Sequence, residues 1–164
     1  MEGENDILIR LYGMRHEEHA ANVARLEEEG IVIKRMMAVN TDEVLAFIGE
    51  NFPPCWCGEA RFAMMHRNCF IAVKGTRLVG FCCISATAPE FLGPIGVIPE
   101  ARGKGVARAL AYRSLCAMKE MGFKYAVGGM VRADFARNLK RNFDVIEIPG
   151  SIGSYEDMID TSIV

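Results

Sequence analysis

The residues with the clearest capacity for chemistry lie between positions 97 and 107, where the chain reads Val-Ile-Pro-Glu-Ala-Arg-Gly-Lys-Gly-Val-Ala. Gly103 and Gly105 allow a ligand to approach the backbone closely, and Arg102 and Lys104 place two positive charges beside them. An apolar run precedes this segment and a helical pattern follows it, so the glycines lead into the first turn of a helix. The backbone N–H groups of such a turn lack partners and lie at the positive end of the helix dipole. The segment therefore predicts a phosphate-binding turn.

Two common phosphate-binding motifs do not fit this segment. A Walker loop has Ser or Thr directly after Gly-Lys, whereas Lys104 is followed by Gly105 and Val106. A dinucleotide-binding fingerprint needs a third glycine at the position where this chain has Arg108. A solvated basic turn without a ligand is the alternative, because such turns are common. The position between an apolar strand and a long helix favours the phosphate site.

The segment resembles the acyl-CoA loop of the GNAT superfamily of N-acetyltransferases, whose signature is Arg/Gln-x-x-Gly-x-Gly/Ala. Arg102, Gly105 and Ala107 match this signature position by position, and Val97 and Pro99 match its usual lead-in. The resemblance implies an α+β fold of sandwich type, in which helices flank a central, twisted, mixed and mostly antiparallel sheet. It also implies acetyl-CoA as the co-substrate.

The resemblance assigns the co-substrate site to two stretches of backbone. Backbone groups of Ile95, Gly96 and Val97 would pair with the pantetheine arm and polarise the thioester. In that fold the strand before the loop separates from the next strand, and the gap admits the pantetheine. Six further residues would surround the pyrophosphate through their backbone N–H groups: Arg102, Gly103, Lys104, Gly105, Val106 and Ala107.

No catalytic residue can be assigned from the sequence. Many GNAT enzymes carry a tyrosine on the helix before the last strand, near the leaving thiolate. The corresponding position holds Asn138 if Phe143 sets the alignment, or Ala136 if Phe135 sets it, and neither side chain is a phenolic acid. Glu90 precedes the strand that leads into the loop and is a candidate base, although an exposed loop glutamate is the simpler interpretation.

Length and composition are those of one globular domain, with 164 residues, of which 51% are hydrophobic and 24% charged. The formal net charge of −2 argues against a nucleic-acid binder, which would need a basic face. No apolar run is long enough to span a bilayer, and the acidic N-terminal segment is unlike a signal peptide. We therefore expect a cytoplasmic protein without nucleic-acid or membrane partners.

The cysteines predict buried free thiols rather than a disulfide framework, because the chain is neither short nor dense in cysteine. Cys55 and Cys57 form a Cys-x-Cys pair that could bind a metal, but a full ligand set is not evident, so no metal is expected. Three other cysteines lie in apolar, strand-like runs: Cys69, Cys82 and Cys83.

Hydrophobic periodicity gives the expected order of elements. Strands are predicted at 7–12, 31–37, 69–73, 78–87, 91–98, 125–130 and 143–148. Helices are predicted at 15–29, around 44–48, and at 59–66, 106–121 and 134–141, with 52–58 as a loop because it contains Pro53 and Pro54.

From residue 31 onward this order resembles the GNAT fold, which predicts an acetyltransferase domain at 31–164. Residues 1–30 are expected to form an N-terminal strand–helix extension, packed on the edge of the sheet or used in a homodimer contact. The expected function is transfer of an acetyl group from acetyl-CoA to an amine of a small molecule or a protein. The alternative is a non-catalytic acyl-CoA-binding sensor or interaction module, which the missing tyrosine keeps open.

Overall fold

The computed structural model describes residues 5–151 and 158–159, and its first sheet has four strands. They are β2 (Ile31–Arg35), β3 (Cys69–Lys74), β4 (Arg77–Ile84) and β5 (Leu92–Val97), adjacent in this order and all antiparallel. β3 and β4 form a hairpin in which Lys74 pairs with Arg77. β4 lies inside the sheet and is buried on both faces from Val79 onward, as its almost continuous run of apolar residues predicts.

The second sheet has three strands and brings the two ends of the chain together. β1 (Ile7–Arg10) lies between β6 (Tyr125–Gly128) and β7 (Val145–Glu147) and pairs with both in antiparallel register. The expected position of the first strand on a sheet edge is therefore wrong. The alternating pattern of β1 did predict its burial, since Ile7 and Ile9 are fully buried, but no local signal in the sequence identifies its two partners.

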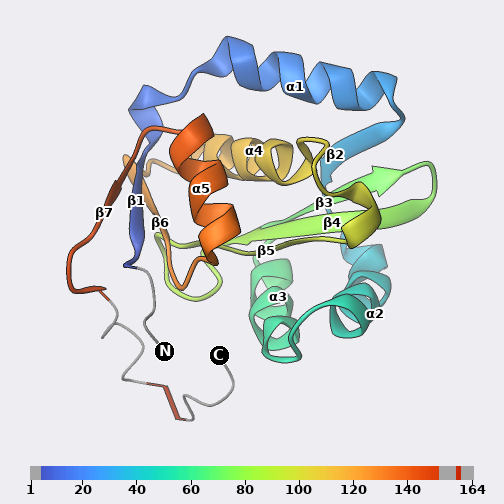
Figure 1. The fold of residues 1–164 in the computed structure, drawn as a ribbon. Helices are drawn as coiled ribbons and strands as arrows, with labels where there is room; N and C mark the ends of the chain where they lie inside the picture. Colours follow the sequence, from blue (N-terminus) through green and yellow to red (C-terminus); the bar gives the residue numbers. More distant parts are fainter. Residues whose placement is uncertain (1–4, 152–157, 160–164) are drawn as a thin grey trace.

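Five helices are described, and they form layers on both faces of the four-stranded sheet (Figure 1). α4 (Val106–Glu120) covers one face, and α1 (His16–Glu28) lies across the outer side of α4. α2 (Thr41–Asn51) and α3 (Cys55–Met65) cover the opposite face, while α5 (Ala133–Asn142) stands beside α4 near the junction of the two sheets. The sheet thus separates two clusters of buried side chains, one beneath α4 and one beneath α2 and α3.

The main local difference from the expected elements is at α3, which begins at Cys55 rather than at residue 59. Pro54 occupies the N-cap position with φ −57°. A proline at the start of a helix costs no hydrogen bond, so the proline pair begins the helix instead of extending the loop. Cys55 and Cys57 therefore lie in the first turn of α3. The expectation of buried free thiols is confirmed for Cys69, Cys82 and Cys83.

Candidate functional site

The two sheets meet where β5 and β6 run parallel for a short distance. A bridge joins Phe91 to Val127, and the Val127 N–H donates to the Glu90 carbonyl over 2.8 Å. Beyond this bridge the strands belong to different sheets, and β5 is an edge strand of its own sheet. The separation of these two strands, which the GNAT resemblance implied, is therefore present in the structure.

A cavity of about 560 Å³ lies against β5 and is called the β5 cavity below. Its walls come from β5, from the segment between β5 and α4, from α5 with its N-cap, and from the connection between α2 and α3. Its lining residues are Asn51, Phe52, Pro53, Trp56, Ile95, Gly96, Val97, Ala101, Arg102, Gly103, Gly105, Val106, Ala107, Arg132, Asp134, Phe135, Asn138 and Arg141.

The glycine loop, residues 102–105, forms one end of this cavity. Gly103 has φ +73° and Gly105 has φ +87°, which are left-handed conformations that glycine adopts without strain. Gly105 is the N-cap of α4, and no side-chain hydrogen bond caps that helix within the described residues. The first N–H groups of α4 are therefore available to an anion in the cavity.

The structure brings together all but one of the residues that the sequence predicted for the co-substrate. Eight positions line the β5 cavity, whereas Lys104 lines a smaller cavity of about 140 Å³ with Lys74, Arg77 and Glu100. The Arg102 Nε atom donates to the Val97 carbonyl over 2.9 Å and so ties the loop to the end of β5. Arg102 thus has a structural contact in addition to its positive charge.

Two aromatic residues of the cavity wall were not among the predicted site residues. Phe52 ends α2, and Trp56 lies in the first turn of α3; their rings stack with centroids 5.6 Å apart. Phe52 packs onto the backbone of Gly96, where no side chain intervenes. The sequence treated both residues as part of a loop, so the only available signal was an aromatic pair flanking Pro53-Pro54.

α5 forms the opposite wall, and the two positions that the sequence left open on it lie in different surroundings. Asn138 lines the cavity and its backbone carbonyl accepts a hydrogen bond from Asn142 Nδ2 over 2.9 Å. Ala136 is only 2% exposed and packs in the core beneath α4. Among the described residues that line the cavity, none is a tyrosine. Glu90 is exposed and lies outside the lining, so the structure gives it no place as a base in this cavity.

Two further features are absent from residues 5–151 and 158–159. No helix in this part of the chain combines the length and apolarity that crossing a membrane requires. No group of three or more His, Cys, Asp or Glu side chains is arranged there to hold a metal ion.

The decisive comparison is with protein families. A model of the acetyltransferase (GNAT) family matches residues 15–139. The chain belongs to the GNAT family. The match begins at residue 15 and therefore includes α1 as well as the glycine loop. A comparison with curated protein sequences finds no match.

Solved structures share this GNAT fold. A GCN5-related glucosamine N-acetyltransferase region of a fungal multi-domain GH3 β-N-acetylglucosaminidase has a TM-score of 0.70 at 16% identity, over 88% of this chain and 20% of that chain. A GCN5-related N-acetyltransferase from Sphaerobacter thermophilus has a TM-score of 0.61 at 17% identity, over 89% of this chain and 50% of that one. The present chain thus spans a fifth of the first protein and half of the second.

A third structure is close to this chain in length. It is a GNAT family acetyltransferase from Brucella melitensis in complex with acetyl-CoA, with a TM-score of 0.52 at 16% identity. The similarity covers 74% of this chain and 90% of that one. At such identities these comparisons establish the GNAT fold and not a shared acceptor.

Proposed function

We propose that this GNAT protein is an acyl-CoA-dependent N-acetyltransferase that moves an acetyl group from acetyl-CoA to an amine of a small molecule or a protein. The observation that carries the proposal is the continuity of one cavity. It runs from the glycine loop, where N–H groups can receive a pyrophosphate, along the edge of β5, where backbone groups can receive an extended arm. Membership of the GNAT family and the acetyl-CoA complex of the Brucella protein support the same co-substrate.

The glycine loop and the first turn of α4 would hold the pyrophosphate of acetyl-CoA. Gly103, Gly105, Val106 and Ala107 present backbone to the cavity, and Arg102 adds a positive charge at its edge. Anions bind favourably at such a helix N-terminus because unpaired N–H groups and the helix dipole act together. Lys104 contributes charge from the outer side of the loop, since its side chain lines a different cavity.

The edge of β5 would hold the pantetheine arm and orient the thioester. Ile95, Gly96 and Val97 line the cavity, and the Phe52 ring fills the space that a side chain at Gly96 would take, so the arm would run along the backbone beside that ring. A backbone N–H at this edge would stabilise the negative charge that develops on the thioester oxygen as the amine attacks. Catalysis would depend mainly on holding amine and thioester in reactive geometry.

The acceptor amine and its proton transfers are not assigned to residues. We place the acceptor near the aromatic wall of Phe52 and Trp56, at the end of the cavity away from the glycine loop. The alternative function, an acyl-CoA-binding module without catalysis, is favoured by one observation: among the described residues that line the cavity none is a tyrosine, the side chain that many family members carry on this helix. A cytoplasmic location and a homodimer also belong to this proposal, and light scattering tests the latter.

Titration calorimetry with acetyl-CoA, with ATP and NADH as controls, tests the proposal. We expect selective binding of acetyl-CoA, and an affinity about tenfold lower for Arg102→Met, which keeps the length of the side chain but loses its charge and hydrogen bond. Arg61→Met, on the outer surface of α3, is the matched control and should leave the affinity unchanged. Failure to bind acetyl-CoA would refute the proposal. Selective binding without acetyl transfer to any member of a broad amine panel would favour the non-catalytic module.

A further inference from the structure

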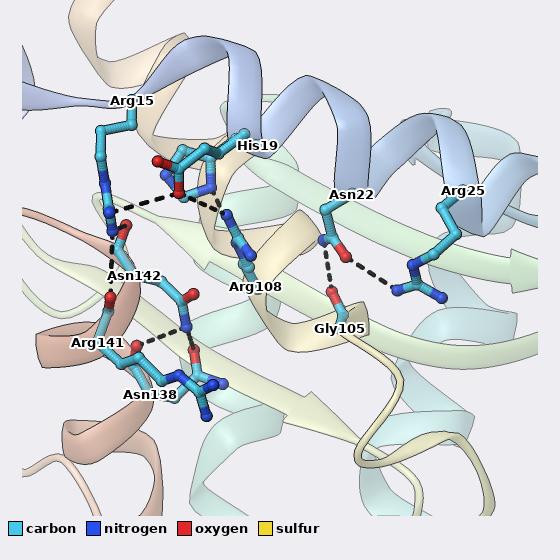
Figure 2. A network of polar contacts seen from close by, with 10 residues as sticks. Arg15, His19, Asn22, Arg25, Gly105, Arg108, Asn138, Arg141 and Asn142 are labelled. Atoms are coloured by element: carbon cyan, nitrogen blue, oxygen red, sulfur yellow. Dashed lines mark hydrogen bonds and ion pairs between the residues drawn. The ribbon is translucent and has the colours of Figure 1, made fainter.

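We infer that Asn22 and Arg25 of α1 are positioning residues that orient the glycine loop for the pyrophosphate. This inference rests on the proposed function, because it concerns how the same loop receives acetyl-CoA. Both residues lie on α1, which crosses the outer side of α4 (Figure 2). This helix belongs to residues 1–30, which the sequence analysis did not include in the site.

Two side chains of α1 bind two consecutive carbonyl groups of the loop. Asn22 Nδ2 donates to the Gly105 carbonyl over 3.0 Å, and Arg25 Nη2 donates to the Lys104 carbonyl over 2.5 Å. The same Arg25 Nη2 atom donates to Asn22 Oδ1 over 3.0 Å, so the two side chains hold each other in place (Figure 2). The four residues form one connected set of hydrogen bonds.

Because the peptide bond is planar, these contacts also orient the backbone N–H groups of Gly105 and Val106. In a planar trans peptide the C=O group and the N–H group of the next residue point in opposite directions. Holding the Lys104 carbonyl toward α1 therefore directs the Gly105 N–H away from α1. Holding the Gly105 carbonyl does the same for the Val106 N–H. These two N–H groups belong to residues that line the β5 cavity.

Arg25 is the more important of the two for this orientation. The Gly105 carbonyl already accepts the first hydrogen bond of α4, from the Ala109 N–H over 3.0 Å, so the helix itself constrains that peptide. The Lys104 carbonyl lies before the helix, and Arg25 is the hydrogen-bond donor that the structure shows for it. Arg25 also pairs with Glu29 over 2.6 Å, which offsets part of its charge. Its main effect is therefore on geometry.

Close packing shows that the loop and the helix are fitted to each other. A Cβ atom at position 105 would lie 2.4 Å from Asn22 Oδ1 and 3.0 Å from Arg25 Nη2. Because Gly105 has no side chain, α1 can pack closely against the outer side of the loop. Glycine also adopts φ +87° at this position without strain.

The other end of α1 holds the opposite wall of the cavity. Arg15 precedes α1, and its Nη2 atom donates to the carbonyls of Arg141 and Asn142 at the end of α5, over 3.1 and 3.2 Å (Figure 2). Arg141 lines the β5 cavity. One helix therefore connects the end of α5 to the glycine loop, and the spacing between these two walls depends on α1.

The test compares Asn22→Leu and Arg25→Met with Glu28→Gln, an exposed control on the same helix. Leu and Met approximate the shapes of the original side chains without donating hydrogen bonds. Each protein is titrated with acetyl-CoA by calorimetry and with S-acetylpantetheine, which lacks the pyrophosphate, by ligand-observed NMR. Amide hydrogen exchange in the ligand-free proteins is a second readout.

We expect acetyl-CoA affinity to fall about tenfold in Asn22→Leu and more in Arg25→Met, while S-acetylpantetheine affinity changes less than twofold. The Ala109 amide, which donates to the Gly105 carbonyl of the loop, should exchange faster in both variants and not in Glu28→Gln. If both variants bind acetyl-CoA like the wild type, or if both ligands weaken equally, the positioning role is refuted while the proposed function stands. If the wild type itself fails to bind acetyl-CoA, the proposed function fails and this inference fails with it.

Discussion

The ring of Phe52 rests on the backbone of Gly96, so that a Cβ atom at position 96 would lie 2.5 Å from Phe52 Cε1. Phe52 ends α2, and Gly96 lies in β5 on the wall of the β5 cavity. Trp56 stacks on Phe52, and Phe47 and Phe81 also contact that ring, which leaves it little room to withdraw. The shape of the cavity along β5 therefore depends on the contact between Gly96 and the ring of Phe52.

The first prediction concerns this contact. Gly96→Ala should lower the free energy of unfolding by about 1–3 kcal/mol, because the new methyl group overlaps the Phe52 ring in a packed wall. Gly58→Ala is the control: position 58 lies within α3, a Cβ there meets no atom within 4 Å, and alanine favours the helix. Gly58→Ala should leave stability unchanged or raise it by up to about 1 kcal/mol. Urea unfolding measures both.

A second substitution tests whether the cost of Gly96→Ala comes from overlap with Phe52 or from a general sensitivity of β5 to substitution. Phe52→Leu removes the ring atoms that a Cβ at position 96 would meet. In that background Gly96→Ala should cost clearly less than in the wild type, so the double-mutant cycle should give a favourable coupling between the two sites. Strictly additive effects would show that Phe52 does not limit the space at Gly96.

The two glycines of the loop should respond differently to the same substitution. Gly103→Ala adds a methyl group that meets no atom within 4 Å, and its cost of about 1–2 kcal/mol arises from φ +73° alone. Gly105→Ala has a similar backbone strain and also overlaps Asn22, so it should be less stable by a further 1–3 kcal/mol. We expect a correspondingly larger loss of acetyl-CoA affinity, measured by calorimetry. Equal effects of the two substitutions would contradict the close packing of Gly105 against α1.

The lowered pKa of His19 predicts that the stability of the protein depends on pH. His19 is fully buried in α1, and its ring stacks between Tyr112 and Phe143 with centroid distances of 4.7 and 4.5 Å. Burial, and then the positive charges of Arg108 and Arg15, lower the pKa of His19 to about 4. The Arg108 Nε atom donates to His19 Nδ1 over 3.2 Å, which requires this nitrogen to be unprotonated.

The sign of the effect follows from the lowered pKa. Below pH 6.5 the unfolded chain takes up a proton at His19 that the folded protein does not accept until about pH 4. The contribution of neutral His19 to the free energy of unfolding should therefore be complete above pH 6.5. It should fall as the pH drops toward 4, by roughly 3 kcal/mol at most. The comparison is with His19→Gln, which can still accept a hydrogen bond from Arg108. A loss of stability of the same size in this variant over pH 6.5 to 4 would exclude His19 as its source.

Most of the elements and the glycine loop could be predicted from the sequence because their signals are local. Apolar periodicity marks β4 and α4, and Gly105 before Val106 marks the start of the helix that faces the cavity. The same reasoning predicted eight of the positions that line the β5 cavity, all in one short segment. It misplaced the start of α3, because Pro53-Pro54 is compatible with a loop and with a helix N-terminus alike.

The rest could not be predicted because it depends on contacts between residues far apart in the chain. Asn22 and Arg25 look like ordinary polar residues of an amphipathic helix, and only the folded chain shows that they bind carbonyls at positions 105 and 104. His19 likewise lies in a segment rich in charged residues, yet it is completely buried. Lys104 lies next to the true lining residues in sequence, but its side chain lines a different cavity.

The central position of β1 predicts the result of a truncation. A chain that begins at residue 31 lacks β1, whose Ile7 and Ile9 are fully buried, and leaves β6 and β7 without the strand that joins them. It also lacks Leu26, which is buried in the core beneath α4. We expect this fragment to lose cooperative unfolding in circular dichroism, whereas the full chain retains it. A folded fragment that binds acetyl-CoA would instead support a separate domain at 31–164.

Synthesis on the ribosome separates β1 from both of its partners in time. Ile7 pairs with Gly128 and with Glu147, so β1 is made on the order of ten seconds before β6 and β7 at ordinary rates of translation. The four-stranded sheet, which lies entirely within residues 31–97, can form in that interval. Meanwhile the open edge of β5 offers the nascent β1 an incorrect partner. We therefore expect incorrect strand pairing during synthesis to occur at the edge of β5, the strand that lines the cavity in the folded protein.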